Sequence, residues 1–181
     1  MQAAATGDRG AWKILVDTYA GRAFALAKSR VGNVHDAEEI TQSVFVTVAK
    51  HLRDQLYQER GRFEPWLFTI VMNRVRDFAR KRTREQEGAG VIRQQARLAG
   101  EPARGEWDFD ALRAAIARLE PSDREILELR HHAELGFKQI SEMLNEPMGT
   151  LLARHHRALR KLKSILERDE SRHDDHRGGH A

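Results

Sequence analysis

A glycine-containing polar stretch, residues 85–106, divides this chain of 181 residues into two blocks. The stretch contains four glycines and one proline: Gly88, Gly90, Gly100, Pro102 and Gly105. Because glycine and proline interrupt helices and strands, it is typical of a flexible linker. Each flanking block is long enough for one small domain. We therefore expect two domains, residues 1–84 and 107–168, followed by a disordered tail, residues 169–181.

Apolar residues recur at helical spacing through the first block, which predicts a helical bundle. We expect helices over residues 11–30, 34–52 and about 65–84, with Pro65 at the first helical position of the third. Asn33 is expected to cap the second helix.

The second of these segments is ambiguous, because Ser43–Val48 has strand propensity. Four apolar residues nevertheless lie on one helical face: Ala37, Ile40, Val44 and Val48. No partner for a hairpin is nearby, so we interpret the segment as a helix.

The second block is also expected to be helical. A helix beginning near Asp108 should stop at Pro121, and Ser122 with Glu125 is interpreted as a capping box that begins the next helix. The predicted fold is all-α: a bundle of three to four helices, a flexible linker and a four-helix domain.

Composition excludes several classes of protein. The chain has no cysteine, which rules out disulfides and thiolate metal sites. No apolar run approaches the roughly 20 residues of a membrane span, and the N-terminus lacks the apolar core of a signal peptide. His173, His176 and His180 form a ligand-rich tail, but no metal-enzyme motif or phosphate-binding loop accompanies them. We expect a cytoplasmic protein with no membrane insertion, catalysis, cofactor or bound metal.

Positive charge is concentrated in two places, although the chain has 31 basic and 27 acidic residues in all. One cluster lies between Arg74 and Arg84, and the other between Arg154 and Lys163. Residues 101–128, between them, lean acidic. Two basic clusters indicate two contacts with a polyanion such as nucleic acid. The alternative is two solvated helix faces.

Residues 137–163 have the pattern of a helix-turn-helix. A short amphipathic segment is broken at residues 145–147, and a longer basic helix begins at Met148. The N-terminal half of such a second helix lies in the major groove of DNA. Four residues are expected to pack inward: Leu151, His155, Leu159 and Leu162. Three basic residues share another face: Arg154, Arg157 and Lys161. The alternative is an αα-hairpin within a bundle.

At these residues the chain resembles the extracytoplasmic-function (ECF) sigma factors of the sigma-70 family. Their region 4 is similar to Leu119-Glu-Pro-Ser-Asp-Arg-Glu-Ile-Leu-Glu-Leu-Arg130, then Ile140 and Pro147-Met-Gly-Thr-Leu-Leu-Ala-Arg-His-His-Arg-Ala158. Their region 2 is similar to Asp36-Ala-Glu-Glu-Ile-Thr-Gln-Ser-Val-Phe45, with further matches at Phe63, Trp66, Leu67, Ile70, Asn73, Asp77 and Arg80. The resemblance covers nearly the whole chain apart from the linker and tail.

The resemblance implies an RNA polymerase sigma factor whose region 2 has two tasks. It would bind the clamp helices of the largest polymerase subunit through Asp36, Glu39, Gln42 and Phe45, although Phe45 could instead support the fold. It would also grip the separated minus-ten strand through Trp66, Asn73, Arg76, Arg80 and Lys81. Packing in the core is the alternative role for Trp66.

Region 4 would read the minus-thirty-five element as duplex and contact the flap of the second-largest subunit. The implied DNA-binding residues are Arg130, Thr150, Leu152, Arg154, His156, Arg157 and Lys161. The chain departs from the family at Leu152-Ala153, where a basic residue followed by serine is common. A leucine cannot donate a hydrogen bond, but it can touch a thymine methyl group.

The implied partners are core RNA polymerase, promoter DNA and an anti-sigma factor. Two other functions fit parts of the pattern. One is a stand-alone helix-turn-helix regulator, which would need a dimer interface or an effector domain. The other is a sigma mimic that sequesters an anti-sigma factor, and such a protein should lose the basic faces that this chain keeps.

Overall fold

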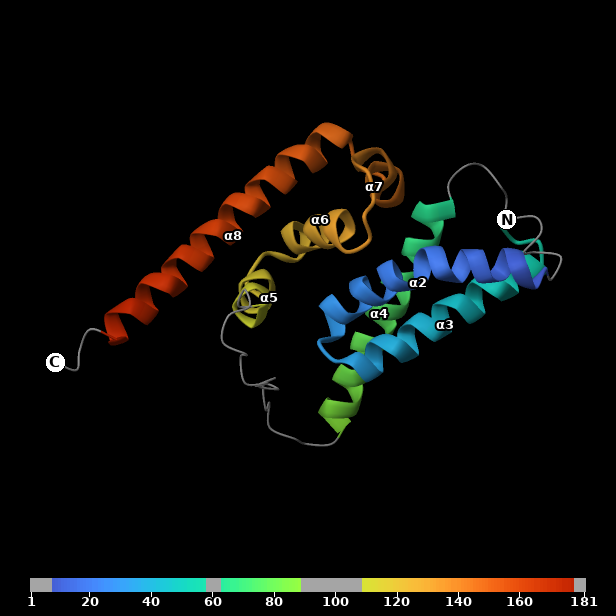
Figure 1. The fold of residues 1–181 in the computed structure, drawn as a ribbon, viewed down its shortest axis with the longest axis horizontal. Coiled ribbons are helices and arrows are strands. Elements are labelled where there is room, and N and C mark those ends of the chain that lie inside the picture. Colours follow the sequence, from blue (N-terminus) through green and yellow to red (C-terminus); the bar gives the residue numbers. More distant parts are fainter. Residues whose placement is uncertain (1–7, 58–62, 89–108, 178–181) are drawn as a thin grey trace.

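The computed structural model describes residues 8–57, 63–88 and 109–177, and every regular element within them is an α-helix. The helices are α2 (Arg9–Val31), α3 (Val34–Arg53), α4 (Phe63–Gly88), α5 (Phe109–Ala117), α6 (Pro121–His131), α7 (Phe137–Leu144) and α8 (Met148–Arg177). Figure 1 shows α2–α4 as one bundle and α5–α8 as a second group beside it. The predicted all-α fold is confirmed.

Local signals begin and end the helices of the first bundle. Asp8 caps α2 by accepting hydrogen bonds from the backbone N–H groups of Gly10 and Ala11, at 2.7 and 3.1 Å. Gly32 ends α2 with φ 83°, a left-handed conformation that glycine adopts without a Cβ clash. Asn33 caps α3, as predicted, because its Oδ1 accepts from the backbone N–H of Asp36 at 2.8 Å.

The strand-prone segment is helical because its apolar residues share the face that the bundle buries. Val44 and Val48 are fully buried within the same core as Leu67 and Phe68 of α4. Full burial of such side chains contributes about 1.5–3 kcal/mol each. This exceeds the small cost of placing β-branched residues in a helix.

The predicted capping box at Ser122 is wrong. Helix α6 begins at Pro121, with Glu120 at the N-cap and no side-chain cap. Proline suits the first helical position because its missing N–H would have no partner there and its φ is already helical. The helix therefore starts before Ser122, and Glu125 is free to reach a residue of α4 instead.

Three other boundaries or faces differ from the prediction. Helix α4 begins at Phe63 and continues to Gly88, so residues 85–88 are helical rather than linker. Helix α8 continues to Arg177, so residues 169–177 are not the disordered tail that we expected. Ala158, not Leu159, lies on the buried face of α8 with Leu151, and Leu159 is exposed. The rest of the expected linker, residues 89–106, lies outside the described residues.

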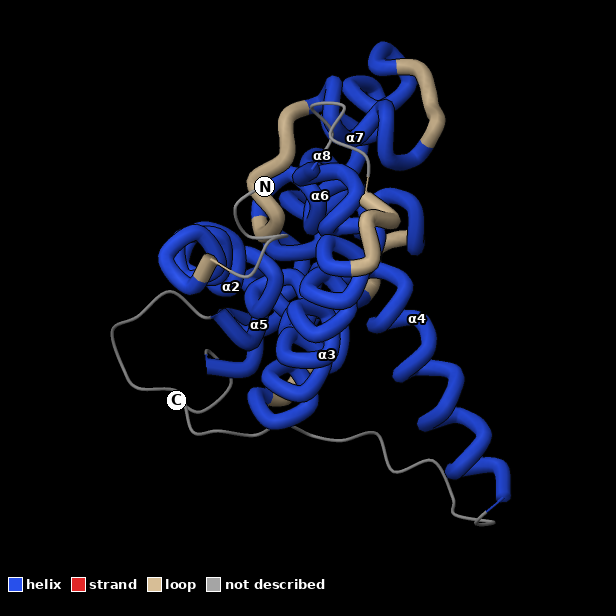
Figure 2. The backbone as a smooth tube through the Cα atoms, turned by 90° about the vertical axis from the view of Figure 1, so that its right-hand side faces the viewer, coloured by secondary structure: helices blue, strands red, loops and turns tan. Residues whose placement is uncertain are grey.

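The two helical groups pack against each other. Helix α4 contacts α7, and α2 contacts α6. In Figure 1, α6 lies between α2 and the long helix α8, and Figure 2 shows the same arrangement from the side. Buried apolar residues of both groups belong to one core cluster, and polar contacts such as that of Arg22 with the Ala133 carbonyl add to it.

Candidate nucleic-acid interface

The C-terminal half of α4 presents an exposed basic face, made by Asn73, Arg76, Arg80 and Lys81. Arg76 donates a hydrogen bond of 3.3 Å to the side-chain oxygen of Asn73. Arg80 lies 3.7 Å from Asp77, and Lys81 lies 3.8 Å from Glu85. Exposed pairs of this kind contribute only about 0–1 kcal/mol, so a phosphate can displace them at little cost. We call these four residues the α4 basic face.

Trp66, at the other end of α4, belongs to an aromatic cluster. Its ring centroid lies 4.6 Å from that of Tyr57, 5.6 Å from Phe63 and 5.8 Å from His51. The indole is half-buried and packs against the core of the first bundle. This position favours the packing role and leaves only part of the ring accessible to a base.

The four residues implied in polymerase binding have different environments on α3. Glu39 and Gln42 are exposed, whereas Phe45 is buried and meets Trp12 edge-on at 6.4 Å between ring centroids. Asp36 is half-buried at the start of the helix, 3.7 Å from Arg82. Glu39 and Gln42 are thus the exposed members of this set, Asp36 is partly exposed, and Phe45 packs in the core.

Val46 belongs to the same exposed face and was missed by the sequence analysis. It follows Gln42 by four residues, so the two side chains lie on one side of α3. Its side chain is 70% exposed, among the highest values for a large apolar residue here. Helical spacing from Gln42 could have identified it, but its exposure required the structure.

Helices α7 and α8 form the predicted helix-turn-helix. Ile140 of α7 and Leu151 of α8 are fully buried and hold the two helices together. Asn145 adopts the left-handed conformation, φ 54°, that ends α7. The Ser141 hydroxyl donates to the Glu146 carbonyl at 2.5 Å, which ties the turn to α7. Thr150 is exposed in the first turn of α8.

The three basic residues predicted to share a face of α8 do not have equal exposure. Arg154 is 15% exposed and donates to Glu146 through both terminal nitrogens, one bond being 3.0 Å. Arg157 is 53% exposed and lies 3.6 Å from Asp123 of α6. Arg154 therefore braces the turn, while Arg157 remains exposed on the surface of α8.

Arg130 and the neighbouring histidines connect α6 to the helix-turn-helix. Arg130 donates to the Leu135 carbonyl at 3.2 Å, and its guanidinium lies over the Phe137 ring. Nε2 of His131 lies 3.1 Å from Nε2 of His155, and burial lowers the pKa of both imidazoles. When both rings are neutral, the Nε2–H of one imidazole can donate a hydrogen bond to the unprotonated Nε2 of the other. His156 is exposed and Leu152 is half-buried on α8.

Two family models match the chain: Sigma-70 region 2 over residues 15–85, and Sigma-70, region 4 over residues 115–164. The ECF RNA polymerase sigma factor SigE of Mycolicibacterium smegmatis is 33% identical over 175 residues, covering 92% of this chain and 67% of SigE. The chain is an ECF RNA polymerase sigma factor of the sigma-70 family. The ECF sigma factor SigW of Bacillus subtilis is 28% identical over 172 residues, covering 88% of this chain and 91% of SigW.

Solved structures share the fold of this sigma factor. The sigma factor RpoE, in complex with the anti-sigma factor NepR from Bartonella quintana, matches with a TM-score of 0.69 and 24% identity, covering 86% of this chain and 96% of RpoE. CnrH, in complex with the cytosolic domain of CnrY, matches with a TM-score of 0.69 and 23% identity, covering 92% and 94% of the two chains. The first bundle thus corresponds to region 2 and the second group to region 4.

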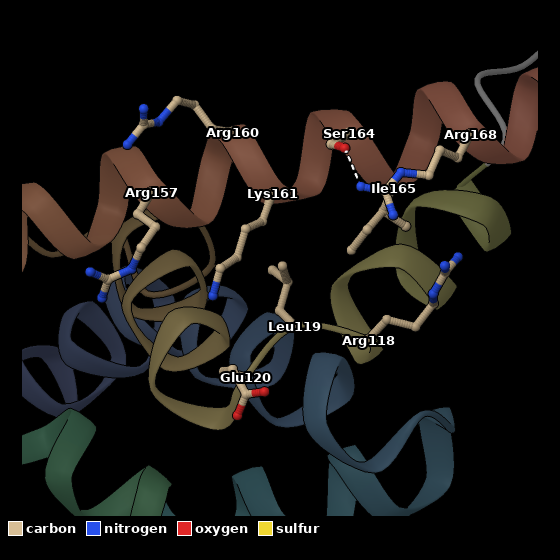
Figure 3. Close-up of a pocket in the computed structure, with 9 residues that line it drawn as sticks. All are labelled: Arg118, Leu119, Glu120, Arg157, Arg160, Lys161, Ser164, Ile165 and Arg168. Carbon is tan, nitrogen blue, oxygen red and sulfur yellow. Dashed lines mark hydrogen bonds between the residues drawn. The ribbon is translucent and has the colours of Figure 1, made fainter.

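A cationic groove of about 490 Å³ runs along α8 of the sigma factor, beside the junction of α5 and α6 (Figure 3). Five basic residues line it against one acid, Glu120: Arg118, Arg157, Arg160, Lys161 and Arg168. Figure 3 shows Lys161 pointing toward α6 and Arg160 pointing away from it. Lys161 donates to Asp123 at 2.6 Å, an acceptor that the sequence analysis did not identify.

Other site types are not supported by the described residues. Among the residues whose side chains are described, 8–57, 63–85 and 111–169, no group of three or more histidine, cysteine or acidic side chains could hold a metal ion. The side chains of the histidine-containing tail, residues 173–180, lie outside that description. Among the described helices, none is both long and apolar enough to span a membrane.

Proposed function

We propose that this sigma factor contacts promoter DNA through two surfaces, the α4 basic face and the helix-turn-helix of α7 and α8, while both units dock on core RNA polymerase. The observation that carries the proposal is the presence of two separate cationic surfaces on the two sigma regions. Residues 1–84 would form the region 2 domain and residues 107–168 the region 4 domain.

The α4 basic face would hold the melted minus-ten strand. Arg76, Arg80 and Lys81 would bind phosphates, and the Asn73 amide would read the edge of a flipped base. The accessible part of Trp66 would stack on a base. The weak ion pairs at Arg80 and Lys81 support this role, because an incoming phosphate replaces a solvent-exposed carboxylate.

The start of α8 would read the minus-thirty-five duplex. Thr150, Leu152 and His156 would face bases, with Leu152 touching a thymine methyl group. Arg157 and Lys161 would bind phosphates or guanine, each held near Asp123. Arg130 and Arg154 would orient the recognition helix, because each is half-buried and engaged with the turn or helix beside it.

The exposed face of α3 would dock on the clamp helices of the largest polymerase subunit through Glu39, Gln42 and Val46. Asp36 would contribute at its edge, and Phe45 would keep the helix in place. Region 4 would contact the flap of the second-largest subunit. Each DNA contact alone is weak, and joining two of them on one chain raises the effective concentration of the second.

We also propose regulation by an anti-sigma factor, because RpoE was solved in complex with the anti-sigma factor NepR and CnrH in complex with the cytosolic domain of CnrY. The protein would act in the cytoplasm, beside RNA polymerase, without a catalytic residue of its own.

The deciding experiment is run-off transcription with core RNA polymerase and a library of genomic fragments. We expect promoter-dependent transcripts that vanish when the sigma factor is omitted. If no fragment supports such a transcript, the proposal is wrong. Size-exclusion chromatography with core polymerase separates this function from that of a stand-alone regulator, which would not co-elute.

A further inference from the structure

A cavity of about 550 Å³ lies between the C-terminal end of α2 and helix α5, which are neighbours in Figure 1. Helix α5 contacts α8, and α2 contacts α6, so α2 and α5 face each other across this space. Residues between Phe24 and Gly32 of region 2 line one side, and α5, Arg124 and His132 of region 4 line the other. Cavities of about 300–1,000 Å³ hold small organic ligands in other proteins.

The cavity has apolar walls that the protein leaves partly uncovered. Phe24 and Val31 of α2 are half-buried, as is Ile116 of α5. Leu112 lies on the same face of α5 as the buried Ala115, yet its side chain is 36% exposed. A ligand with an apolar body would cover these side chains, and removal of apolar surface from water favours binding.

The charged residues that line the cavity are all basic: Lys28, Arg30, Arg113 and Arg124. Among the described residues, no carboxylate pairs with Lys28, whose ammonium lies 6.0 Å from the centroid of the Phe24 ring. The ammonium is therefore available to an anion at the apolar wall.

Arg124 contributes a second positive charge that its hydrogen bonds do not neutralise. Its guanidinium donates to the backbone carbonyls of Ile116 and Leu119, both at 3.2 Å. These acceptors are uncharged, and they hold the guanidinium in place at the end of α5. A fixed cation with neutral partners can stabilise an anionic group beside it.

Negative charge near the cavity does not cancel these cations. Arg30 pairs with the buried carboxylate of Glu128, and the C-terminal ends of α2 and α5 each contribute about half a negative charge. Set against Lys28, Arg30 and Arg124, these leave at least one positive charge among the described side chains. The exposed Arg113 has an interaction of its own and does not enter this balance. Burial lowers the pKa of His132, which keeps its ring neutral at neutral pH.

We propose that this cavity binds a soluble small molecule with an apolar body and one anionic head, such as a medium-chain carboxylate or alkyl sulfate. The body lies between the apolar residues of α2 and α5, and the head lies beside Lys28 and Arg124. A free inorganic anion would leave the apolar walls uncovered, and a neutral apolar compound would leave the positive charge without a partner. Because both sigma regions line the cavity, one bound molecule contacts both.

Isothermal titration calorimetry of the full chain with decanoate, kept below its micelle concentration, tests the proposal. We expect one site per chain. Affinity for decanoate should exceed that for decyltrimethylammonium, decanol and acetate by about tenfold or more, because each of these lacks the anionic head or the apolar body. If decanoate and decyltrimethylammonium bind equally well, the cavity has no preference for anions and the proposal is wrong.

Two variants with matched controls separate the roles of charge and apolar surface. Lys28→Gln should lower affinity for decanoate about three- to tenfold and leave that for decanol within about twofold. Lys13→Gln, on the exposed side of the same helix, should change neither by more than about twofold. Equal losses of decanoate binding in the two lysine variants would overturn the proposal.

Leu112→Ser should lower affinity for decanoate and decanol alike, by about three- to tenfold, because both share the apolar body. The control is Leu159→Ser, which changes a leucine of similar exposure, 39%, on α8. It should alter neither affinity by more than about twofold. If the Leu112 variant binds both compounds as the wild type does, the apolar body does not lie in this cavity.

A photoreactive diazirine derivative of decanoate locates the site independently of any variant. After irradiation and proteolysis, mass spectrometry should find the label in residues 24–32 and 112–117. Labels confined to other segments would overturn the proposal. The remaining alternative is a protein partner: if decanoate does not bind but a synthetic acidic amphipathic helix does, the cavity belongs to a protein-docking surface and the small-ligand proposal is wrong.

Discussion

Lys161 of α8 donates a hydrogen bond of 2.6 Å to Asp123 of α6, whose side chain is 2% exposed. Arg157 approaches the other oxygen of the same carboxylate at 3.6 Å. Two cations that we assign to DNA are therefore positioned by one buried acid in the first turn of α6. This acid joins the recognition helix to its support, and it also benefits from the positive end of the helix dipole.

Replacing Asp123 with asparagine should lower the free energy of unfolding by about 1–2 kcal/mol, because the helix-dipole interaction and a charge-assisted hydrogen bond are both weakened. Urea denaturation measures the change. The matched control is Glu120→Gln, since Glu120 lies at the same end of α6 and makes no side-chain cap. That variant should stay within about 0.5 kcal/mol of the wild type. Equal losses in the two variants would show that Asp123 acts only through its charge.

Arg157→Ala and Arg154→Ala should separate DNA binding from stability. Arg157→Ala should weaken binding to a minus-thirty-five duplex by about 1–3 kcal/mol if the arginine contacts guanine, with little change in unfolding. Arg154→Ala should mainly lower the free energy of unfolding, because Glu146 would lose its charged partner and the turn would lose the contact that ties it to α8. Fluorescence anisotropy on a duplex selected with holoenzyme, together with urea denaturation, measures both. If the affinity of Arg157→Ala for the duplex is unchanged, Arg157 does not contribute to recognition of the minus-thirty-five element.

Glu128 should make stability depend on pH. Burial raises the pKa of Glu128 from 4.5 to about 7, and the nearby Arg30 charge offsets this only in part. Between about pH 4.5 and about pH 7, the Glu128 carboxyl is therefore protonated in the folded protein but ionised in the unfolded chain. The group therefore contributes stability that is fully present below about pH 4.5 and is lost as the pH rises through about 7.

The measurement is urea denaturation of the wild type and of Glu128→Gln at about pH 5 and about pH 8. The free energy of unfolding of the wild type, relative to the variant, should fall by about 1–3 kcal/mol over this range. A difference that stays constant with pH would contradict the prediction.

Val46→Asp should weaken docking on core polymerase about tenfold, because a charge would replace an apolar contact at the centre of the α3 face. Val46 is 70% exposed, so the change should leave the unfolding free energy within about 0.5 kcal/mol. The control is Ile14→Asp, an equally exposed apolar residue, 69%, on α2. Affinity for core polymerase is measured by fluorescence anisotropy of the labelled sigma factor. If both variants bind as the wild type does, the α3 face is not the docking surface.

Local signals in the sequence determined most of the helical pattern of this sigma factor. Asn33 at a cap, Gly32 at a helix end and the short segment 137–144 each act through neighbours only a few residues away. Such signals operate within one turn of helix, so they can be recognised without the fold. Where two signals competed, as at Pro121 and Ser122, the backbone requirement of proline prevailed over the side-chain cap.

Tertiary structure alone decided which charged side chains are exposed and which are held by a partner. Helical spacing placed Arg154 and Arg157 on one face, but only the packing of α7 and α6 shows that Glu146 holds the first and leaves the second exposed. Likewise, the sequence places Arg76 on a basic face without revealing Glu125, 49 residues away, as its partner. Periodicity determines the side of a helix on which a residue lies. The neighbour on that side depends on how distant helices pack, which no local pattern contains.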